Sequence, residues 1–453
     1  MRRTLLPIAA LLGMVVTPLG SAAAADIFVG DSPVSLTLAA PFQDLFDHPA
    51  SDEDFHVSGE LTWTEDGRQP VTVKPVRVSA RGHTSRQASE CPFPKLKIDL
   101  SQADRSGTPL EGIKTLKVGT HCGDRNDEDI TPKYGRLANE HAPLRESMVY
   151  RMLDAAGIPT LRSRPARMSY IFDKSSREPL TRFALLLEDD DDAEARLGGS
   201  GQLDEFTFGS ARELFDPRDT ARLAFAEAMV GNFDWCLRMF RGDIYRCDER
   251  HPLWNVLALV RTGQRALPLP YDFDLAGAVV GRHNWFGQVF SEDFVEPPSR
   301  VRVEVEAQVQ RTRSLFERAL LDDTRRHFRG VREAVNAAIE RSASDEPGKA
   351  LAREYVDAFY DAIDADDRFY RAVIVEGEQQ ASLDPEGARP ACGRSAVIPQ
   401  GTPVSDPLET RGDYARVRLL DALWQWTGND RCDAVHRQPV WVPLRAIGTA
   451  YPR

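Results

Sequence analysis

The stretch Pro268-Leu-Pro-Tyr-Asp-Phe-Asp274 places two carboxylates, Asp272 and Asp274, directly after a short apolar run. In an extended segment, side chains two residues apart project from the same face, so both carboxylates can reach one divalent cation. Magnesium prefers such hard oxygen ligands and is usually held by one or two carboxylates together with substrate phosphates. On the tripeptide alone, the simpler interpretation of two solvated acids at a strand end is favoured.

Alternating apolar residues predict a strand-rich region from Asp26 to about Gly119. In the segment from Lys95 to Leu100, the apolar residues share one face, whereas Lys95, Lys97 and Asp99 share the other. The predicted strands of this region cover residues 34–38, 55–57, 61–63, 71–78, 96–100 and 116–118.

Helical periodicity replaces the alternation further along the chain. An apolar stripe from Leu144 to Leu153 predicts a helix that ends at Gly157. A second helix is expected from about Thr220 to Val230, capped by Asp219 or Thr220. The remaining predicted elements are strand pairs at 165–172 with 182–188 and 254–261 with 266–271, and helices that dominate 301–372.

The segment from Gly377 to Pro390 is rich in Gly, Pro and charged residues, which is typical of a linker. Short strands return after it, among them 414–419 and 440–442. The chain is therefore expected to have an α+β fold with a strand-rich N-terminal lobe, a helix-rich lobe and a small all-β C-terminal part. The predicted domain boundaries are 1–25, 26–375, 376–390 and 391–453.

Residues 1–25 resemble a secretory signal peptide. Arg2 and Arg3 form the positive region, an apolar core follows, and small residues up to Ala25 supply a cleavage site. The core is too short for a permanent transmembrane helix, and no later segment approaches that length. We therefore expect an exported protein, periplasmic or extracellular, with no transmembrane segment in the mature chain.

The net charge is −12, and it becomes −14 without Arg2 and Arg3. Such an acidic chain is not expected to bind nucleic acid, because binding requires basic surface that neutralises phosphates. The cysteine count is 6, and an even count in an exported protein favours disulfides. The local arrangement suggests the pairs Cys91–Cys122, Cys236–Cys247 and Cys392–Cys432, although six cysteines allow about fifteen pairings. A metal site at Cys91, His121 and Cys122, with His83, is the alternative to the first pair.

Several motifs follow one another in a fixed order over about residues 30–320. They are Arg81-Gly-His-Thr-Ser85, Lys95-Leu-Lys97, Leu144-Arg-Glu146 before a helix, Phe183-Ala-Leu-Leu-Leu-Glu-Asp189, Gly231-Asn-Phe-Asp234 and Pro270-Tyr-Asp-Phe-Asp274. In this order they resemble the CotH family of spore-coat-type atypical protein kinases and their bacterial relatives. In addition, Leu116-Lys-Val-Gly-Thr-His-Cys122 resembles a subgroup of exported CotH-like proteins without assigned function.

This resemblance implies a two-lobed protein-kinase-like fold that binds ATP and magnesium between its lobes. Phosphoryl transfer requires a cation on the nucleotide phosphates, magnesium, and a carboxylate aligned on the attacking hydroxyl. Carried over from the family, Lys97 contacts the phosphates, with Lys95 as the alternative on the same strand face, and Arg81 belongs to the loop that covers them. The acceptor is then a protein or a small hydroxyl-bearing molecule.

The family likewise implies roles for the acidic residues. Asp234 is the expected catalytic carboxylate, and Asp272 is the principal magnesium ligand, assisted by Asp274. Glu188 is expected to orient the lysine or to touch the nucleotide, with Glu146 as its competitor.

Each of these residues also has a purely structural interpretation. Lys97 is then a solvated strand lysine, Glu188 begins a solvated acidic run, and the loop from Arg81 is a simple turn. Asp234 is then a helix cap or a loop residue, and His121 is a core histidine.

One position departs from the family pattern. The family commonly has Asn five residues after the catalytic Asp, as a second metal ligand, whereas this chain has Met239. Asp243 is a candidate replacement, because a carboxylate suits magnesium at least as well as an amide does. Without one, the protein is a catalytically inactive pseudokinase that acts as a binding or scaffold protein at the cell envelope.

The C-terminal region resembles a bacterial Src-homology-3-like barrel, a module that often contacts cell-wall material or an envelope protein. The residues that match are Ile398-Pro-Gln-Gly-Thr-Pro-Val404, Tyr414-Ala-Arg-Val417 and Val440-Trp-Val442. A cap packed on the main domain is the alternative. A metal-dependent hydrolase that uses Asp234, Asp272 and Asp274 is a third functional class, for which the chain offers no Gly-x-Ser-x-Gly motif or His-rich site.

Overall fold

The computed structural model describes residues 26–48, 51–52, 54–65, 67, 69–126, 129–203, 211–239, 253–281, 300–377, 379–391, 397–398, 400–419 and 438–450. The predicted signal peptide, Asp243, and the cysteines at 247, 392 and 432 lie outside these residues. The described part combines strands and helices, as the α+β prediction requires. Within it, none of the helices has the length and apolar character needed to cross a bilayer.

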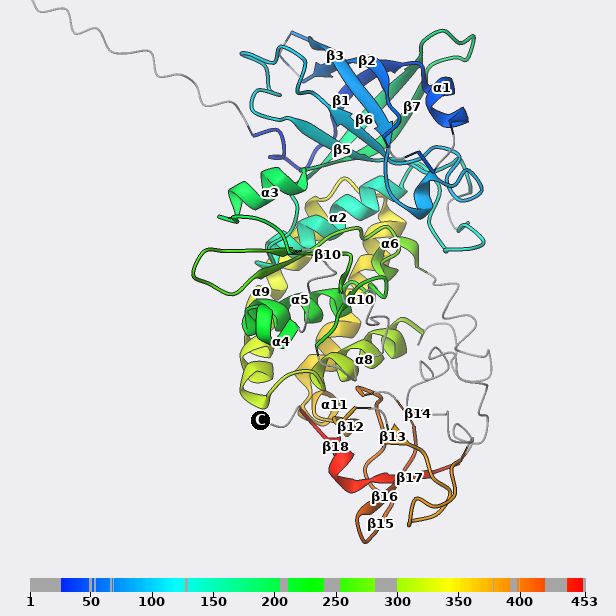
Figure 1. The fold of residues 1–453 in the computed structure, drawn as a ribbon, viewed down its shortest axis with the longest axis vertical. Coiled ribbons are helices and arrows are strands. Elements are labelled where there is room, and N and C mark those ends of the chain that lie inside the picture. The colour runs from blue at the N-terminus through cyan, green and yellow to red at the C-terminus, as the bar shows by residue number, and fades with distance from the viewer. Residues whose placement is uncertain are drawn as a thin grey trace, which may run out of the picture.

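A closed barrel forms the N-terminal part of the fold (Figure 1). The strand order is β1-β2-β3-β4-β5-β7-β6, and β6 closes the barrel by pairing in parallel with β1. Alternate apolar residues, such as Leu96 and Ile98 of β4, point into its core, which explains the period of two in the sequence. The strands are β1 (Val34–Ala40), β2 (Val57–Thr64), β3 (Val71–Ala80), β4 (Leu96–Asp99), β5 (Thr115–Gly119), β6 (Ser163–Phe172) and β7 (Leu180–Leu187), and the short helix α1 (Phe42–Asp47) follows β1.

Most helices lie below the barrel in Figure 1, and α2 (Ala142–Ala155) packs between the barrel strands β6 and β7 and the helices α6 and α9. Gly157, with φ of 68°, follows α2 as predicted. The other helices are α3 (Asp190–Arg196), α4 (Ala211–Leu214), α5 (Pro217–Met229), α6 (Gly277–Val280), α8 (Arg300–Arg313), α9 (Arg318–Arg341), α10 (Glu346–Asp364) and α11 (Asp366–Phe369).

Two local sequence predictions for this region need correction. Asp216, not Asp219 or Thr220, caps α5, because its carboxylate accepts the N–H groups of Arg218 and Asp219 and Pro217 occupies the first turn. Leu144-Arg-Glu146 lies inside the first half of α2 rather than before it.

Two short strand pairs lie among the helices. β8 (Cys236–Leu237) pairs with β9 (Leu253–Trp254), and β10 (Val256–Leu259) pairs with β11 (Leu267–Pro270). These pairs bring the segment after Asp234 next to the one that leads to Asp272.

The C-terminal part consists of small sheets at the lower end of the molecule in Figure 1. The segment expected as a linker contributes to them, since Ser382 exchanges backbone hydrogen bonds with Trp441. Strands are thus confirmed here, and closure into a Src-homology-3-like barrel stays a prediction. The strands are β12 (Val373–Ile374), β13 (Gln379–Gln380), β14 (Val397–Ile398), β15 (Glu409–Arg411), β16 (Tyr414–Val417), β17 (Val440–Pro443) and β18 (Ile447–Gly448).

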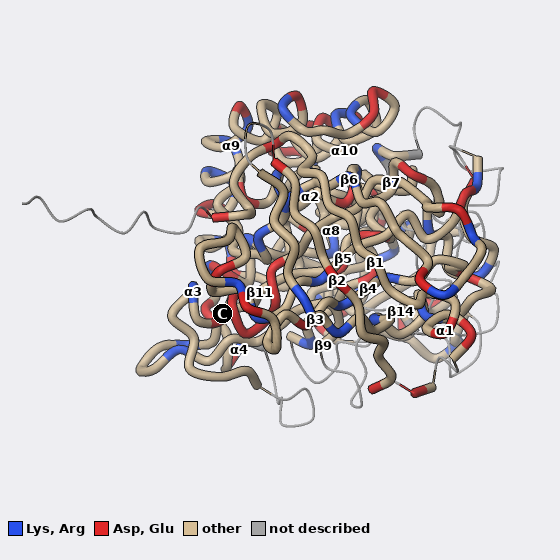
Figure 2. Tube along the Cα trace, turned by 90° about the horizontal axis from the view of Figure 1, so that it is seen from above, with Lys and Arg blue, Asp and Glu red and all other residues tan. Residues whose placement is uncertain are grey.

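Acidic and basic positions are interleaved along α9 and α10 (Figure 2). Several of them pair between the two helices, as in Arg353 Nε with Glu340 Oε1 at 2.7 Å and Arg329 Nε with Asp364 Oδ1 at 2.9 Å. This surface therefore carries charge of both signs and is not the continuous basic face that nucleic-acid binding needs.

Tyr355 of α10, which is fully buried, packs against two glycines of the central region. A Cβ at Gly231 would lie 2.1 Å from its ring, and a Cβ at Gly277 would lie 2.2 Å from its hydroxyl. The Gly277 N–H also donates to the Gly231 carbonyl at 3.0 Å. The segment that carries Asp234 and the segment after Asp274 are thereby held together on one aromatic side chain.

We predict that Gly231→Ala lowers the free energy of unfolding by about 2–5 kcal/mol, combining overpacking with the cost of a left-handed backbone. Gly231 has φ of 63° and no room for a methyl group. Gly263→Ala is the matched control, because Gly263 has φ of 71° and no atom within 4 Å of an added Cβ. Its loss should be about 1–2 kcal/mol, from the backbone alone. Equal losses in urea denaturation would contradict the packing role of Tyr355.

Candidate functional site

Two cationic side chains, Lys95 and Arg136, form ion pairs with the Asp-x-Asp motif at the boundary between the barrel and the helices. The Lys95 ammonium forms ion pairs with Asp272 and with Asp274, whose Oδ2 lies 2.8 Å from Nζ. Arg136 Nε donates to the same Asp274 oxygen at 2.7 Å. Both carboxylates thus pair with one side-chain cation, and their joint ligation of a divalent cation stays a prediction.

The local backbone that achieves this differs from the expected extended segment. β11 ends at Pro270, and Asp272 has a left-handed φ of 64°. Phe273 is fully buried and packs edge-on against Tyr150 of α2, with ring centroids 4.9 Å apart. The Asp272 N–H donates to the Tyr150 hydroxyl at 3.1 Å. An anchored ring between the two acids therefore fixes their direction.

Lys97, the lysine expected at the phosphates, does not face these carboxylates. It lies in the middle of β4, is exposed, and is paired in register with Ser79 and Lys117. Lys95 precedes the strand and is only 6% exposed, and its carbonyl accepts the Arg81 N–H at 2.8 Å. The geometry therefore replaces Lys97 with Lys95, the alternative on the same strand face.

Burial and charge compete at each ionisable group of this cluster. Burial disfavours the charged form of Lys95, but Asp272 and Asp274 outweigh it and hold the pKa of Lys95 above its usual range. Burial would raise the pKa of Asp274, but Arg136 and Lys95 outweigh it and hold that pKa well below the usual range. The lysine and Asp274 are therefore both charged at neutral pH.

Glu146, on the same face of α2 as Tyr150, is a buried acid whose charge acts on Lys95. Burial raises the pKa of Glu146 to about 7, Lys95 opposes this shift, and Asp274 and Asp272 add to it. Glu188, the other candidate, is fully buried at the end of β7 and is engaged by two arginines: Arg162 Nε at 2.8 Å and Arg196 Nη2 at 2.7 Å. Of the two acids weighed for the lysine, Glu146 is the one whose charge acts on it.

Asp234 lies in the loop that follows α5 and accepts a hydrogen bond on each carboxylate oxygen. Trp254 Nε1 donates to Oδ1 at 3.2 Å, and Asn255 Nδ2 donates to Oδ2 at 3.0 Å. Asp234 therefore does not cap α5, and its carboxylate is oriented by donors from the neighbouring strand pair.

A cavity of ≈ 620 Å³ is lined by three of the candidate residues, Arg81, Asp234 and Asp272, whereas Lys95 and Asp274 are not among its lining residues. Asp234 and Asp272 both line it, together with Arg136, the turn Arg81–Ser85 and the strand β10. This volume lies within the range of about 300–1,000 Å³ that is typical of small-molecule sites. Cationic groups from the barrel side and carboxylates from the helical side therefore share one space.

The Arg81–Ser85 turn is built around Gly82. Its φ is 88°, and a Cβ there would lie 2.2 Å from the Ser85 hydroxyl oxygen. The Ser85 hydroxyl donates to the Arg81 carbonyl at 3.2 Å. A glycine that brings the backbone close to the cavity is what a phosphate-covering loop needs, and it is also what a tight turn needs.

The carboxylate oxygens of this site decide whether it suits a metal ion. Among the described residues, no group of three or more His, Cys, Asp or Glu side chains is placed to hold a metal ion by itself. Asp274 Oδ1 and Glu146 Oε1, however, are buried carboxylate oxygens without a hydrogen-bond partner in the described structure. Such hard donors suit magnesium, provided that substrate phosphates complete its shell.

The first two cysteines form the predicted Cys91–Cys122 disulfide, so they do not supply thiolates to a metal. His121 is 1% exposed and lies against Phe93, with ring centroids 4.8 Å apart. Burial lowers the pKa of His121 to about 4, as expected for a core histidine. Cys236 also belongs to a disulfide. Its predicted partner, Cys247, lies outside the described residues.

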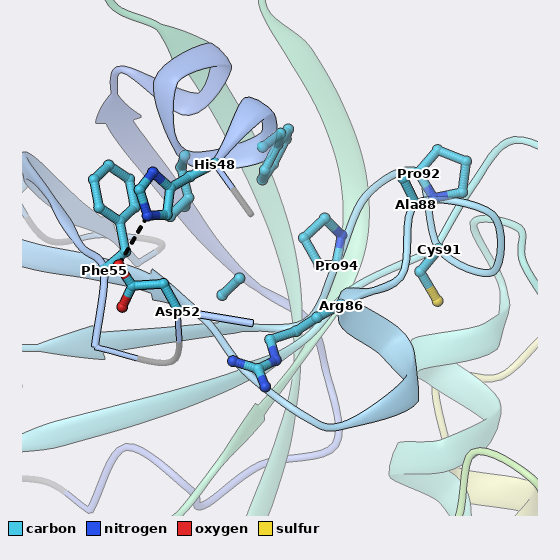
Figure 3. Close-up of a pocket in the computed structure, with 11 residues that line it drawn as sticks. His48, Asp52, Phe55, Arg86, Ala88, Cys91, Pro92 and Pro94 are labelled. Carbon is cyan, nitrogen blue, oxygen red and sulfur yellow. Dashed lines mark hydrogen bonds and ion pairs between the residues drawn. The ribbon is translucent and has the colours of Figure 1, made fainter. Parts of the chain in front are cut away.

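A second cavity, of only ≈ 40 Å³, lies at the side of the barrel (Figure 3). Figure 3 shows His48 directed at Asp52, with Nε2 2.9 Å from Oδ2, while Arg86 and Pro94 lie across the space. This volume admits about one water molecule and excludes a nucleotide. The larger cavity is therefore the candidate site.

No protein-family model and no curated protein matches this chain. The CotH resemblance consequently stays a prediction that is based on the motifs alone.

Sequence reasoning did not select Arg136, Trp254 or Asn255. Arg136 lies in irregular structure, where spacing carries no signal, and its partner Asp274 is 138 residues away. Trp254 and Asn255 lie in the predicted strand at 254–261, and their contact with Asp234 depends on the β8–β9 pairing.

We predict that Lys95→Met lowers the free energy of unfolding by about 3–5 kcal/mol, because it leaves the partly buried Asp272 without its cation and Asp274 with Arg136 alone. Lys97→Met is the matched control on the same strand, and it should change stability by no more than about 0.5 kcal/mol. Urea denaturation of both variants measures the difference. Similar effects of the two substitutions would contradict the assignment of Lys95 as the buried partner.

Glu227 of α5 is connected to Asp234 through hydrogen bonds of Asn232. It is fully buried, and it accepts a hydrogen bond from Asn232 Nδ2 at 2.9 Å, while Asn232 Oδ1 accepts the Asp234 N–H at 3.0 Å. Burial raises the pKa of Glu227 to about 8, Asn232 opposes this shift, and the charge of Asp234 adds to it.

Because this folded-state pKa exceeds the unfolded value, the protonated Glu227 contributes stability at low pH that is lost as pH rises to about 8. Glu227→Gln keeps an acceptor for Asn232 and does not titrate. We therefore predict that this variant gains stability relative to the wild type between about pH 5 and about pH 8. Parallel pH profiles of the unfolding free energy would show that Glu227 is not held protonated.

Proposed function

We propose that this protein is an exported, CotH-like atypical kinase that transfers phosphate from ATP, with magnesium, to a hydroxyl of a protein or small molecule. The observation that carries the proposal is a cavity of nucleotide size lined by Asp234, Asp272 and the Arg81–Ser85 turn, with Lys95 ion-paired to Asp272. A cation for the phosphates, a carboxylate for the metal and a carboxylate for the attacking hydroxyl are the parts that phosphoryl transfer requires.

The proposal includes a two-lobed, kinase-like relation between the barrel and the helices. The order of the motifs supports it, since the lysine comes from the barrel strands and the two aspartates come from the helical part. The CotH resemblance is the reason to expect this relation. The ion pair between Lys95 of the barrel and Asp272 of the helical part is compatible with it.

Each residue has a separate task in the proposed reaction. Lys95 neutralises phosphate oxygens, and the backbone of the Arg81–Ser85 turn covers them. Asp234 accepts a hydrogen bond from the acceptor hydroxyl and aligns it for in-line attack. Asp272 is the principal magnesium ligand and Asp274 the second, with Arg136 fixing the direction of Asp274. Magnesium, when bound, would neutralise charge on the transferring phosphoryl group.

Glu188 has no direct task in this scheme. Its carboxylate is occupied by Arg162 and Arg196, and it therefore orders the connection between β7 and α3. The C-terminal strands are proposed to hold the protein at cell-wall material or an envelope partner, as the barrel resemblance implies.

One observation favours a second candidate, a nucleotide-binding or scaffold protein without catalysis. Met239, at the usual position of the second metal ligand, is 4% exposed and belongs to the main apolar core. A buried thioether does not replace an amide oxygen as a magnesium ligand. The replacement suggested by the sequence, Asp243, lies outside the described residues.

We predict that ATP with magnesium raises the melting temperature of the wild type, because a ligand at about a hundred times its dissociation constant adds about 2.7 kcal/mol of stability. Asp272→Asn should remove this gain. Asp234→Asn should retain it and abolish phosphate transfer. Asp413→Asn, an exposed position between β15 and β16, is the control and should behave as the wild type.

The outcomes separate the candidates. Stabilisation together with ADP formation in the presence of acceptors supports the kinase, whereas stabilisation without any transfer supports the binding protein. If no nucleotide stabilises the wild type with any divalent metal, the kinase is contradicted and a scaffold protein that binds no nucleotide is supported.

A further inference from the structure

The strand pair β8–β9 brings Trp254 and Asn255 into contact with Asp234. Cys236 is paired in register with Trp254, and Leu237 with Leu253. The residue after Trp254 therefore reaches the loop that contains Asp234, although it is 21 residues away in the sequence. Topology thus places an asparagine beside the proposed catalytic carboxylate, whereas the position five residues after Asp234 holds Met239.

Asn255 bridges the two functional segments. Its Nδ2 donates to Asp234 Oδ2 at 3.0 Å and also to the Asp234 carbonyl. Its own carbonyl accepts the N–H of Tyr271 at 3.1 Å, directly before Asp272. One residue thus contacts the loop of the catalytic carboxylate and the turn of the metal ligand.

The backbone of Asn255 is constrained in a way that suits this residue type. Its φ is 51°, in the left-handed region that asparagine adopts more readily than most side chains do. The residue is 8% exposed and lines the cavity together with Asp272. Strained positions of this kind concentrate at functional sites.

The two ends of the Asn255 amide have different surroundings. Both hydrogen bonds of the side chain use the nitrogen as donor, and both end on Asp234. The Oδ1 atom accepts no hydrogen bond from the described residues and is not among their buried unpaired atoms. An amide oxygen is therefore available at the wall of the cavity, and amide oxygens are ligands for hard cations.

We propose that Asn255 takes the place left by Met239: its amide nitrogen orients Asp234, and its amide oxygen ligates a divalent cation held at Asp272. This inference rests on the proposed nucleotide and magnesium site. It assigns the second oxygen ligand to a neighbouring strand pair instead of the loop that follows Asp234, and it removes the main objection to catalysis.

The test is the affinity of the full chain for Mn²⁺ in the presence of a non-hydrolysable ATP analogue, measured by electron paramagnetic resonance of the free ion. Asn255→Gly accommodates the left-handed backbone and should weaken Mn²⁺ binding about tenfold, a loss typical of groups that support a metal site. Asn255→Asp retains an oxygen and should bind Mn²⁺ at least as tightly as the wild type. Lys174→Gly, at an exposed position with φ of 61°, is the matched backbone control.

An Asn255→Gly variant that binds Mn²⁺ as the wild type does, or an Asn255→Asp variant that loses binding, would overturn the assignment. The second variant keeps the test decisive should the first fail to fold. If the wild type itself binds no Mn²⁺ with the analogue, the proposed function fails and this inference fails with it. That result differs from one in which the wild type binds Mn²⁺ and the variants bind it with the same affinity.

Discussion

The ion pairs of Lys95 with Asp272 and Asp274 join the barrel to the helical part of the chain. A buried lysine is costly unless carboxylates compensate it, and the carboxylates are equally costly without the lysine. The barrel therefore supplies the cation that the carboxylates need, and the helical part supplies the carboxylates that the lysine needs. The packing of Phe273 on Tyr150 and of Tyr355 on Gly231 and Gly277 positions the acidic side of this contact.

Charge within the cluster is balanced when Glu146 is ionised. Three cations, Lys95, Arg81 and Arg136, interact with three acids, Asp272, Asp274 and Glu146. The pKa of Glu146 is raised to about 7, because burial and the neighbouring carboxylates outweigh Lys95 and Arg81. The Cys91–Cys122 disulfide holds the segment that leads to Lys95 against the one that leads to Arg136, and Phe93 donates to the Cys122 carbonyl at 3.1 Å. An added cation or a phosphate would rearrange a cluster that is already close to balance, which is what a ligand site requires.

The sequence predicted local features well where one period dominates. Alternation identified the barrel strands, and the apolar stripe identified α2. The alternation of side chains could not distinguish Lys95 from Lys97, because both belong to the same face of the segment. Only Lys95, which directly precedes β4, reaches the acids. Glu188 was expected to partner the lysine from the CotH resemblance alone, whereas in the structure Arg162 and Arg196 occupy its carboxylate. Arg136 and Asn255 act over long sequence distances through tertiary pairing, which no local pattern encodes.

We propose that Lys95 lies beside the phosphates of a bound nucleotide. An ATP derivative with a reactive acyl phosphate transfers its acyl group to a lysine at this position, and peptide mass spectrometry identifies the modified residue. We expect acylation of Lys95 that excess ATP with magnesium prevents. Modification of Lys97 instead, or no nucleotide-protected lysine at all, would contradict the account.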